Sequence, residues 1–304
     1  IKALIRVISP TLMPSLEEIV KEAAKAIVKM ASVSPAEDVV NALRNAVKIE
    51  IHEPSRVQLN AILTNIELAQ KYTAAVCQDT GVPTFFIRLG DGFPIRSKLF
   101  SILTEAVREV TRELPLRSNS VDPLTEKNSG DNTGIGIPVF DVELFDGDYL
   151  EMIYTPKGGG TELPSKAFVV PPGNAWERLP ELVLNAVIDA GPMPCPPVIV
   201  GIGIGPNLDV AAKLAKKAAV LRPVGSRNSN PDIAKIEDAL LNAINKLGIG
   251  AHGTGGTVTA LDVHIEYAYR HPATFAIGIV FSCWATRRAR AIVYPDGKYE
   301  VKPL

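Results

Sequence analysis

The chain has 304 residues, of which 46% are hydrophobic and 21% are charged, and its formal net charge is −1. This composition is typical of a globular protein with a sizeable core and argues against a disordered or fibrous chain. The charge predicts no broad basic face for nucleic acid, and the lack of any run of 18 apolar residues predicts no membrane span. The first residues, IKALIRVISPTLMPS, contain no apolar segment with a small-residue cleavage site, so we expect a cytoplasmic location.

Residues 1–72 are expected to form a layer of helices. Ser15, Ser34 and Ser55 each precede a Glu or Gln by three residues, which is the pattern of a helix-capping box. An amphipathic pattern follows each serine, and Pro35 is expected at the first helical position after Ser34. We therefore predict three helices that pack together.

From residue 73 onward, predicted helices and strands are mixed. Strands are predicted at residues 82–89, 139–144, 150–154 and 198–204, with more in the C-terminal tail, which ends in a PDG hairpin. Helices are predicted at residues 97–114, 176–189, 211–220 and 231–248, and residues 115–138 form a polar loop. Because no repeat or clean linker is visible, we predict one mixed α/β (α+β) unit over residues 1–304. In it, a helical layer (1–72) packs on a mixed-sheet part (73–304).

Two glycine-rich segments follow predicted strands. GIGIGPN at residues 201–207 lacks the Gly-x-Gly-x-x-Gly spacing of dinucleotide-binding folds, so a tight strand-to-helix turn with Asn207 as the N-cap is the better interpretation. PKGGGTE at residues 156–162 places three glycines beside Lys157. Three glycines are costly to order, which favours a loop that approaches a ligand over a bare turn.

Arginine and histidine side chains supply further candidates. Arg117 lies in the polar loop, and its guanidinium suits a carboxylate, although an isolated loop arginine is usually solvated. None of the four histidines has the spacing of a zinc site. His264 lies in an alternating strand pattern and is interpreted as structural, whereas His271 precedes a proline in a loop and is the better functional candidate.

The chain contains three cysteines, Cys77, Cys195 and Cys283, which lie far apart in the sequence. An odd, sparse set does not indicate a disulfide framework, and three buried thiols are the simplest interpretation. Cys195 lies between prolines, and Cys283 is followed by the pair Arg287–Arg288, whose charge favours a thiolate. Three rigidly held thiolates could also converge on one metal centre.

Five motifs occur in the order CQDTG, PKGGGTE, CPPVIVGIGIG, HGTGGTVTALDV and CWATRR. Together they resemble the α subunit, or N-terminal half, of class I fumarate hydratases and L(+)-tartrate dehydratases, which are iron–sulfur hydro-lyases. The resemblance implies that Cys77, Cys195 and Cys283 hold a 4Fe-4S cluster whose fourth iron has no protein ligand and acts as a Lewis acid. It also implies the reversible hydration of fumarate to malate, with L(+)-tartrate dehydration as the alternative.

The same resemblance assigns roles to individual residues. Asp79 matches the acid/base position, and substrate-binding positions are matched by Gln78, Arg117, Gly160, Thr161 and His271. Larger single-chain members continue into a second domain, so we expect a separate β subunit to complete the site, in an α2β2 heterotetramer. Two alternatives remain open, a cluster-binding sensor or electron-transfer protein and a structural module with buried thiols. The first would need a fourth ligand or a Cys-x-x-Cys pair, and the second would bind no iron.

Overall fold

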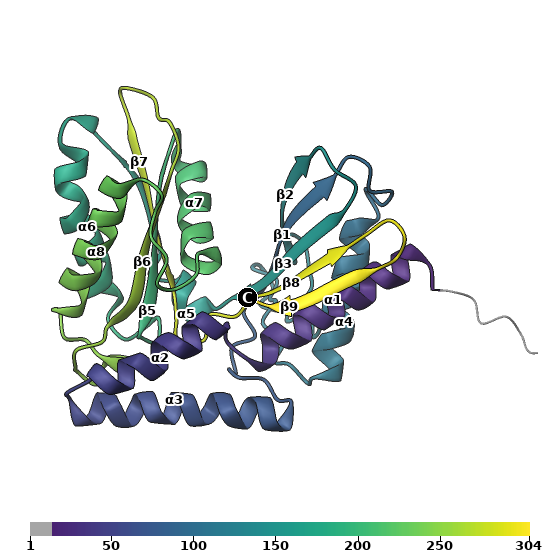
Figure 1. Ribbon diagram of the computed structural model, residues 1–304, viewed down its shortest axis with the longest axis horizontal. Coiled ribbons are helices and arrows are strands. Elements are labelled where there is room, and N and C mark those ends of the chain that lie inside the picture. Colours follow the sequence, from purple (N-terminus) through teal and green to yellow (C-terminus); the bar gives the residue numbers. More distant parts are fainter. Residues whose placement is uncertain (1–13) are drawn as a thin grey trace, which may run out of the picture.

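A computed structural model describes residues 14–304 (Figure 1). The N-terminal segment that we inspected for a leader, and the start of the predicted helical layer, lie largely outside the described residues. Two mixed sheets and their flanking helices confirm the predicted mixed α/β class. None of the helices in residues 14–304 combines the length and apolar character that a bilayer crossing requires. The treatment of residues 1–304 as one unit stays a prediction.

The three N-terminal helices are α1 (Leu16–Val33), α2 (Glu37–Ile49) and α3 (Glu53–Tyr72). Ser15 caps α1 in a complete capping box with Glu18, as predicted. The prediction for Ser34 is wrong, because Ser34 ends α1 and the N-cap of α2 is Ala36, so Pro35 lies outside the helix.

The predicted cap at Ser55 is also wrong. Helix α3 begins at Glu53, before this serine, and has a proline in its first turn, a position that proline favours. The Ser55 hydroxyl is buried and accepts a hydrogen bond of 3.0 Å from the backbone N–H of Ala251. The serine therefore joins α3 to a distant loop instead of starting a helix.

The first sheet has five strands in the order β2-β1-β3-β8-β9. The strands are β1 (Val82–Gly90), β2 (Val139–Phe145), β3 (Leu150–Lys157), β8 (Ala289–Val293) and β9 (Tyr299–Pro303). Only the pairing of β1 with β2 is parallel. Helices α1 and α4 (Leu99–Glu113) pack on this sheet and form the first core with it.

The second sheet has four strands in the order β4-β7-β5-β6. The strands are β4 (Lys166–Val170), β5 (Val198–Gly205), β6 (Ala260–Tyr267) and β7 (Phe275–Ser282). Helices α6 (Ala175–Ala190) and α8 (Pro231–Asn245) cover one face, and α7 (Leu208–Leu221) covers the other, between the two sheets (Figure 1). Strand β4 was not predicted, because this short edge strand is half exposed and has little pattern.

A third core joins the two parts of the molecule. Its buried side chains come from α2, α3, Ala36, Ile199 of β5 and the loops around residues 76, 251, 258 and 284. Helix α3 runs along the base of the molecule in Figure 1, below the four-stranded sheet and the junction between the two sheets. The loops that carry the candidate functional residues therefore pack against α2 and α3.

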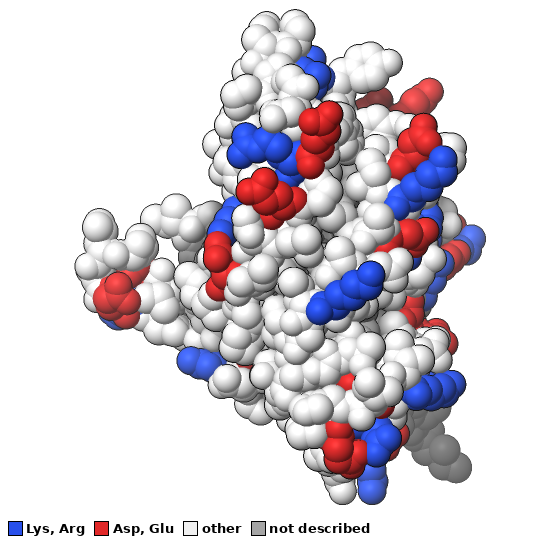
Figure 2. Space-filling view, turned by 90° about the vertical axis from the view of Figure 1, so that its left-hand side faces the viewer, with Lys and Arg blue, Asp and Glu red and all other residues white. Residues whose placement is uncertain are grey.

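Charged side chains are mixed on the face that carries α6 and α8. Figure 2 shows lysine and arginine interspersed with aspartate and glutamate there, separated by uncharged surface. That face therefore carries no broad patch of one sign.

Candidate metal and substrate site

The three cysteines line one cavity of about 690 Å³. Cys77 lies between α3 and β1, Cys195 between α6 and β5, and Cys283 directly after β7. The segment after Cys283 leads into β8, so the cavity lies where the chain passes from one sheet to the other. Cys195 and Cys283, which lie 118 and 206 residues downstream of Cys77, therefore line the same cavity as Cys77. A shared metal centre at the three thiols stays a prediction.

Tight local structure holds each cysteine loop. Cys195 adopts a left-handed conformation with φ of 54°, and its N–H donates to Pro192. The carbonyl of Cys283 accepts hydrogen bonds from both the N–H and the hydroxyl of Thr286. Arg287 then donates to the carbonyl of Asp79 at 2.9 Å, which ties this turn to the segment that carries Cys77.

The protein alone does not favour thiolates at Cys195 and Cys283. Burial raises the pKa of Cys283 to about 11, although Arg287 opposes this shift. Burial, with the nearby Cys77 and Asp79, raises the pKa of Cys195. Of the two arginines expected to favour the Cys283 thiolate, only Arg287 does so. Arg288 faces away and pairs with Asp38 at 2.5 Å. A bound metal would supply the missing stabilisation of the thiolates.

The three cysteines supply a donor set that is compatible with a group of several metal atoms. Within residues 14–304, no three His, Cys, Asp or Glu side chains come close enough to hold a single metal ion. In a cluster each cysteine binds its own iron, so the sulfur atoms can stand farther apart. Three sulfur donors around one cavity fit such a group.

Asp79 presents a carboxylate fixed by three donors. Its Oδ1 accepts from the N–H of Gly81 at 2.9 Å and from Asn119 Nδ2 at 2.8 Å, and its Oδ2 accepts from the N–H of Gly159 at 2.8 Å. The side chain is half-buried and lines the cavity with Cys77. A carboxylate held in this way can accept a proton at a defined position.

The PKGGGTE segment wraps around Asp79. It ends β3 and forms the single turn α5 (Gly159–Glu162). A Cβ on Gly158 would lie 3.0 Å from Asp79 Oδ2, and one on Gly160 would lie 2.9 Å from the Met193 carbonyl. Close approach to a backbone carbonyl therefore requires glycine at position 160, and a side chain at position 158 would press on the Asp79 carboxylate. Gly160 and Thr161 both line the cavity.

Lys157 anchors the same segment from below. Its buried Nζ contacts Thr161 Oγ1 at 2.6 Å and Glu162 at 3.0 Å. Burial lowers the pKa of Lys157, and the charge of Glu162 opposes this shift. The lysine is thus a structural support of the glycine turn.

Gln78 and Arg117 lie together at the exposed mouth of the cavity. Arg117 Nη1 donates to Gln78 Oε1 at 3.0 Å. The arginine backbone is pinned, since its carbonyl accepts from Thr80 Oγ1 at 2.6 Å and from Asn132 Nδ2 at 3.1 Å. The long polar loop therefore presents a guanidinium beside the cysteines and Asp79.

His271 does not line this cavity. It is exposed in the loop between β6 and β7, where its Nδ1 accepts from the N–H of Ala273. His271 lies before the start of β7, and Cys283 lies directly after its end. The eight residues of this strand span about 26 Å, so His271 and Cys283 lie at opposite ends of it. Figure 1 shows this loop at the tip of the four-stranded sheet.

Three further residues that line the cavity, His252, Asn119 and Trp284, were not predicted from the sequence. Arg287, expected beside Cys283, lines it as well. His252 and Trp284 belong to the quoted motifs HGTGGTVTALDV and CWATRR, which were the available signal. Burial lowers the pKa of His252. His264, by contrast, is fully buried and bonded to Asp262, as its structural interpretation predicted.

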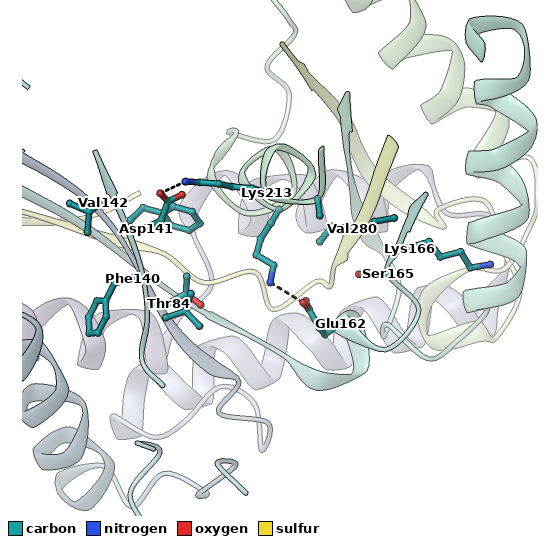
Figure 3. Close-up of a pocket in the computed structure, with 14 residues that line it drawn as sticks. Thr84, Phe140, Asp141, Val142, Glu162, Ser165, Lys166, Lys213 and Val280 are labelled. Atoms are coloured by element: carbon teal, nitrogen blue, oxygen red, sulfur yellow. Dashed lines mark hydrogen bonds and ion pairs between the residues drawn. The ribbon is translucent and has the colours of Figure 1, made fainter. Parts of the chain in front are cut away.

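A second cavity of about 520 Å³ lies between the two sheets (Figure 3). Strands β1 and β2 line one side, and β4, β7 and α7 line the other. Its charged groups are largely paired, with Lys213 2.6 Å from Asp141 and Lys216 2.8 Å from Glu162. This arrangement leaves little free charge for a ligand there, so we place the functional site at the cysteines.

Comparisons with known proteins indicate the family of the chain. A family model described as fumarate hydratase (fumerase) matches residues 21–292. A protein of Methanocaldococcus jannaschii that carries the provisional name L(+)-tartrate dehydratase subunit alpha is 44% identical over 267 residues, which cover 86% of this chain and 93% of its own. The L(+)-tartrate dehydratase alpha subunits of Escherichia coli K12 and Shigella sonnei are 37% identical over 272 residues, which cover 89% of both chains.

Proposed function

The chain belongs to the fumarate hydratase family of hydro-lyases, and we propose that it is the catalytic, cluster-binding α subunit of an enzyme that adds or removes water on a dicarboxylate. One observation carries this proposal. Cys77, Cys195 and Cys283 line a single cavity together with the fixed carboxylate of Asp79. Metal ligands and a proton acceptor therefore share one site.

Cys77, Cys195 and Cys283 are the residues that would hold a 4Fe-4S cluster. The chain has only these three cysteines, so one iron would lack a cysteine ligand. When bound, such a cluster supplies a Lewis acid that polarises the C–O bond of a 2-hydroxy acid. The absence of a fourth cysteine favours this role over electron transfer, for which four ligands are usual.

The protein residues around the cluster position would bind the substrate and move a proton. Asp79 would take the proton from the carbon next to the hydroxyl-bearing carbon, because its donors hold one carboxylate face in a fixed place. Arg117 and Gln78 would bind the carboxylate remote from the metal, since a guanidinium recognises carboxylates through paired N–H groups. Gly160 and Thr161 would pack along the substrate.

The preferred substrate of the enzyme is either L(+)-tartrate or the pair fumarate and malate. The resemblance led us to expect fumarate and malate, with L(+)-tartrate as the alternative. The names of relatives at 37–44% identity favour L(+)-tartrate. We therefore place tartrate first and malate second.

A partner subunit belongs to the proposal. The relatives are named as alpha subunits, which supports a separate β subunit that supplies further substrate contacts. His271 is too far from the cysteine cavity of its own chain to bind a substrate there. If His271 binds substrate, it must therefore do so in the cavity of a second copy, and an α2β2 assembly would allow this. An exposed iron also favours the reducing cytoplasm, which remains our predicted location.

The test is an iron count followed by an activity assay. The chain, co-expressed with its β subunit and reconstituted without oxygen, is expected to bind about four irons, and Cys283→Ser is expected to lose them. The loaded complex should dehydrate L(+)-tartrate faster than malate. Wild-type protein without specific iron would contradict the proposal. Full iron without dehydration of either acid would favour a sensor or electron-transfer protein.

A further inference from the structure

His252 carries a polar atom that nothing else in the site explains. Its Nε2 is buried and has no hydrogen-bond partner among the residues that the structure describes, and the side chain lines the cysteine cavity. An unpaired buried N–H destabilises the folded protein, because it has lost its hydrogen bond to water. Such a group is usually retained where something bound in the site pairs with it.

The other ring nitrogen indicates which nitrogen bears the hydrogen. Gln58 in α3 presents its Nε2 to His252 Nδ1 at 3.0 Å. An amide nitrogen can only donate, so Nδ1 accepts and the hydrogen of the neutral ring lies on Nε2. The ring therefore offers one N–H donor to the cavity.

The backbone places this donor between two cysteine loops. His252 has a φ of 51°, an uncommon left-handed conformation for a residue other than glycine, and its N–H donates to the carbonyl of Pro196 at 2.8 Å. Pro196 follows Cys195. The imidazole also lies 6.2 Å from the ring of Trp284, which follows Cys283.

Depth in the cavity distinguishes the possible partners of Nε2. Gln78 and Arg117, which would bind the substrate, are exposed at the mouth. The Nε2 atom is shielded from solvent beside the loops that carry the metal ligands. The partner of Nε2 is then a group held between the Cys195 and Cys283 loops, with which His252 is in contact, and not the substrate at the mouth.

We propose that His252 is a positioning residue that donates its Nε2–H to a sulfur atom of the cluster held by Cys77, Cys195 and Cys283. This inference rests on the proposed function. Hydrogen bonds to cluster sulfur stabilise the more negative, reduced state and so raise the reduction potential. His252 would thus tune the cluster without contacting the reacting carbon.

Two substitutions of His252 distinguish the effect of its hydrogen-bond donor from the effect of its side-chain packing. His252→Gln and His252→Met give side chains of similar size that suffer the same left-handed backbone, but only glutamine keeps an N–H donor. Each variant is reconstituted without oxygen as the complex with the β subunit. Iron per chain and the reduction potential of the cluster are then measured. We expect a shift to more negative potential in His252→Met and a smaller one in His252→Gln.

A third variant leaves the cavity lining unchanged. Gln58→Met removes the partner of Nδ1 and frees the ring, so we expect a partial shift in the same direction. This variant carries the test if His252→Met does not fold.

The outcomes distinguish this inference from the proposed function. Wild-type iron with no shift in either His252→Met or Gln58→Met would overturn the inference alone. Equal shifts in the Gln and Met variants would assign the effect to packing and also overturn it. A raised KM with an unchanged potential would assign the donor to the substrate instead. Wild-type protein without iron would overturn both proposals.

Discussion

Asp79 receives hydrogen bonds from three separate segments, the Cys77 loop, the polar loop and the glycine turn. A hydrogen bond to a charged group contributes about 1.5–3 kcal/mol, so the three together fix the carboxylate strongly. The glycine turn approaches Asp79 most closely at Gly158, where a Cβ would lie 3.0 Å from Oδ2. Gly160 instead lies against the carbonyl of Met193.

Replacing Asp79 with asparagine tests its role in proton transfer. The amide keeps the size of the side chain but cannot take a proton, so kcat of the assembled enzyme should fall about 10²–10⁴-fold with iron content unchanged. Iron per chain and steady-state dehydration are measured together. The exposed Asp148→Asn serves as the control and should retain full activity. Turnover of Asp79→Asn within tenfold of wild type would exclude Asp79 as the proton acceptor.

The segments GIGIGPN and HGTGGTVT show how glycines set the packing of whole elements. A Cβ on Gly201 or Gly203 would overlap backbone oxygen atoms of α7, so these glycines let the helix lie directly on β5. Asn207 caps that helix as predicted. Gly256 of HGTGGTVT instead brings the chain against Glu50, which follows α2.

Glu50 holds the HGTGGTVT loop through backbone groups. Its buried carboxylate accepts from the N–H groups of His52, Thr257 and Val258 at 2.9–3.1 Å. Burial alone would raise the pKa of Glu50, but these donors outweigh it and lower the pKa to about 2. Because the folded-state pKa is depressed, this stabilisation is complete above the unfolded value near 4.5 and is lost as pH falls toward 2.

Glu50→Gln should therefore destabilise the chain at neutral pH. Loss of the charged acceptor should lower the free energy of unfolding by about 2 kcal/mol at pH 7. The difference from wild type should shrink below pH 4.5. Urea unfolding of the metal-free chain between pH 7 and pH 3.5 measures it, with Glu67→Gln on the exposed face of α3 as the control. A difference that does not change with pH would show that charge on Glu50 is not the cause.

Most elements could be predicted from local pattern, but their partners could not. The capping box at Ser15 is satisfied within its own helix, so the sequence suffices there. Ser55 shows the same pattern, yet its hydroxyl is used by Ala251, almost 200 residues away. Strand β4 depends on pairing with β7, and its own five residues carry too little alternation to predict it.

For the functional site, too, the local motifs could be predicted from the sequence, whereas the contacts between them could not. Cysteines and glycines belong to dense motifs, and the structure brings the three cysteines and the PKGGGTE segment to one cavity. The function of His252 depends on Gln58 of another element, which no motif relates to it. Arg288 shares a motif with Cys283 but turns away, because the chain begins β8 at the next residue. The sequence therefore predicted which segments belong to the site, but not the direction in which each side chain points.

The whole molecule carries its cysteine site at the junction of two sheets and His271 at the far tip of one of them. Around that tip, Tyr269 is 94% exposed, and Tyr267 and Trp176 are also exposed. Exposed aromatic side chains in one patch mark a contact surface. A second copy that docks there would contact the loop of His271, and the proposal that His271 completes the site of another copy requires such a contact.

Mixing two inactive variants tests this arrangement. If His271 acts across copies, then in a hybrid of His271→Asn and Asp79→Asn chains one site receives both wild-type groups, whereas the other receives neither. Random assembly of equal amounts should thus restore about one quarter of wild-type activity, since half of the pairs are hybrids and each has one intact site. Dehydration is assayed after co-expression with the β subunit, and each variant alone is the control. Activity no higher than that of the single variants would mean that His271 does not complete the site of a second copy, and full activity of His271→Asn alone would remove this residue from the site.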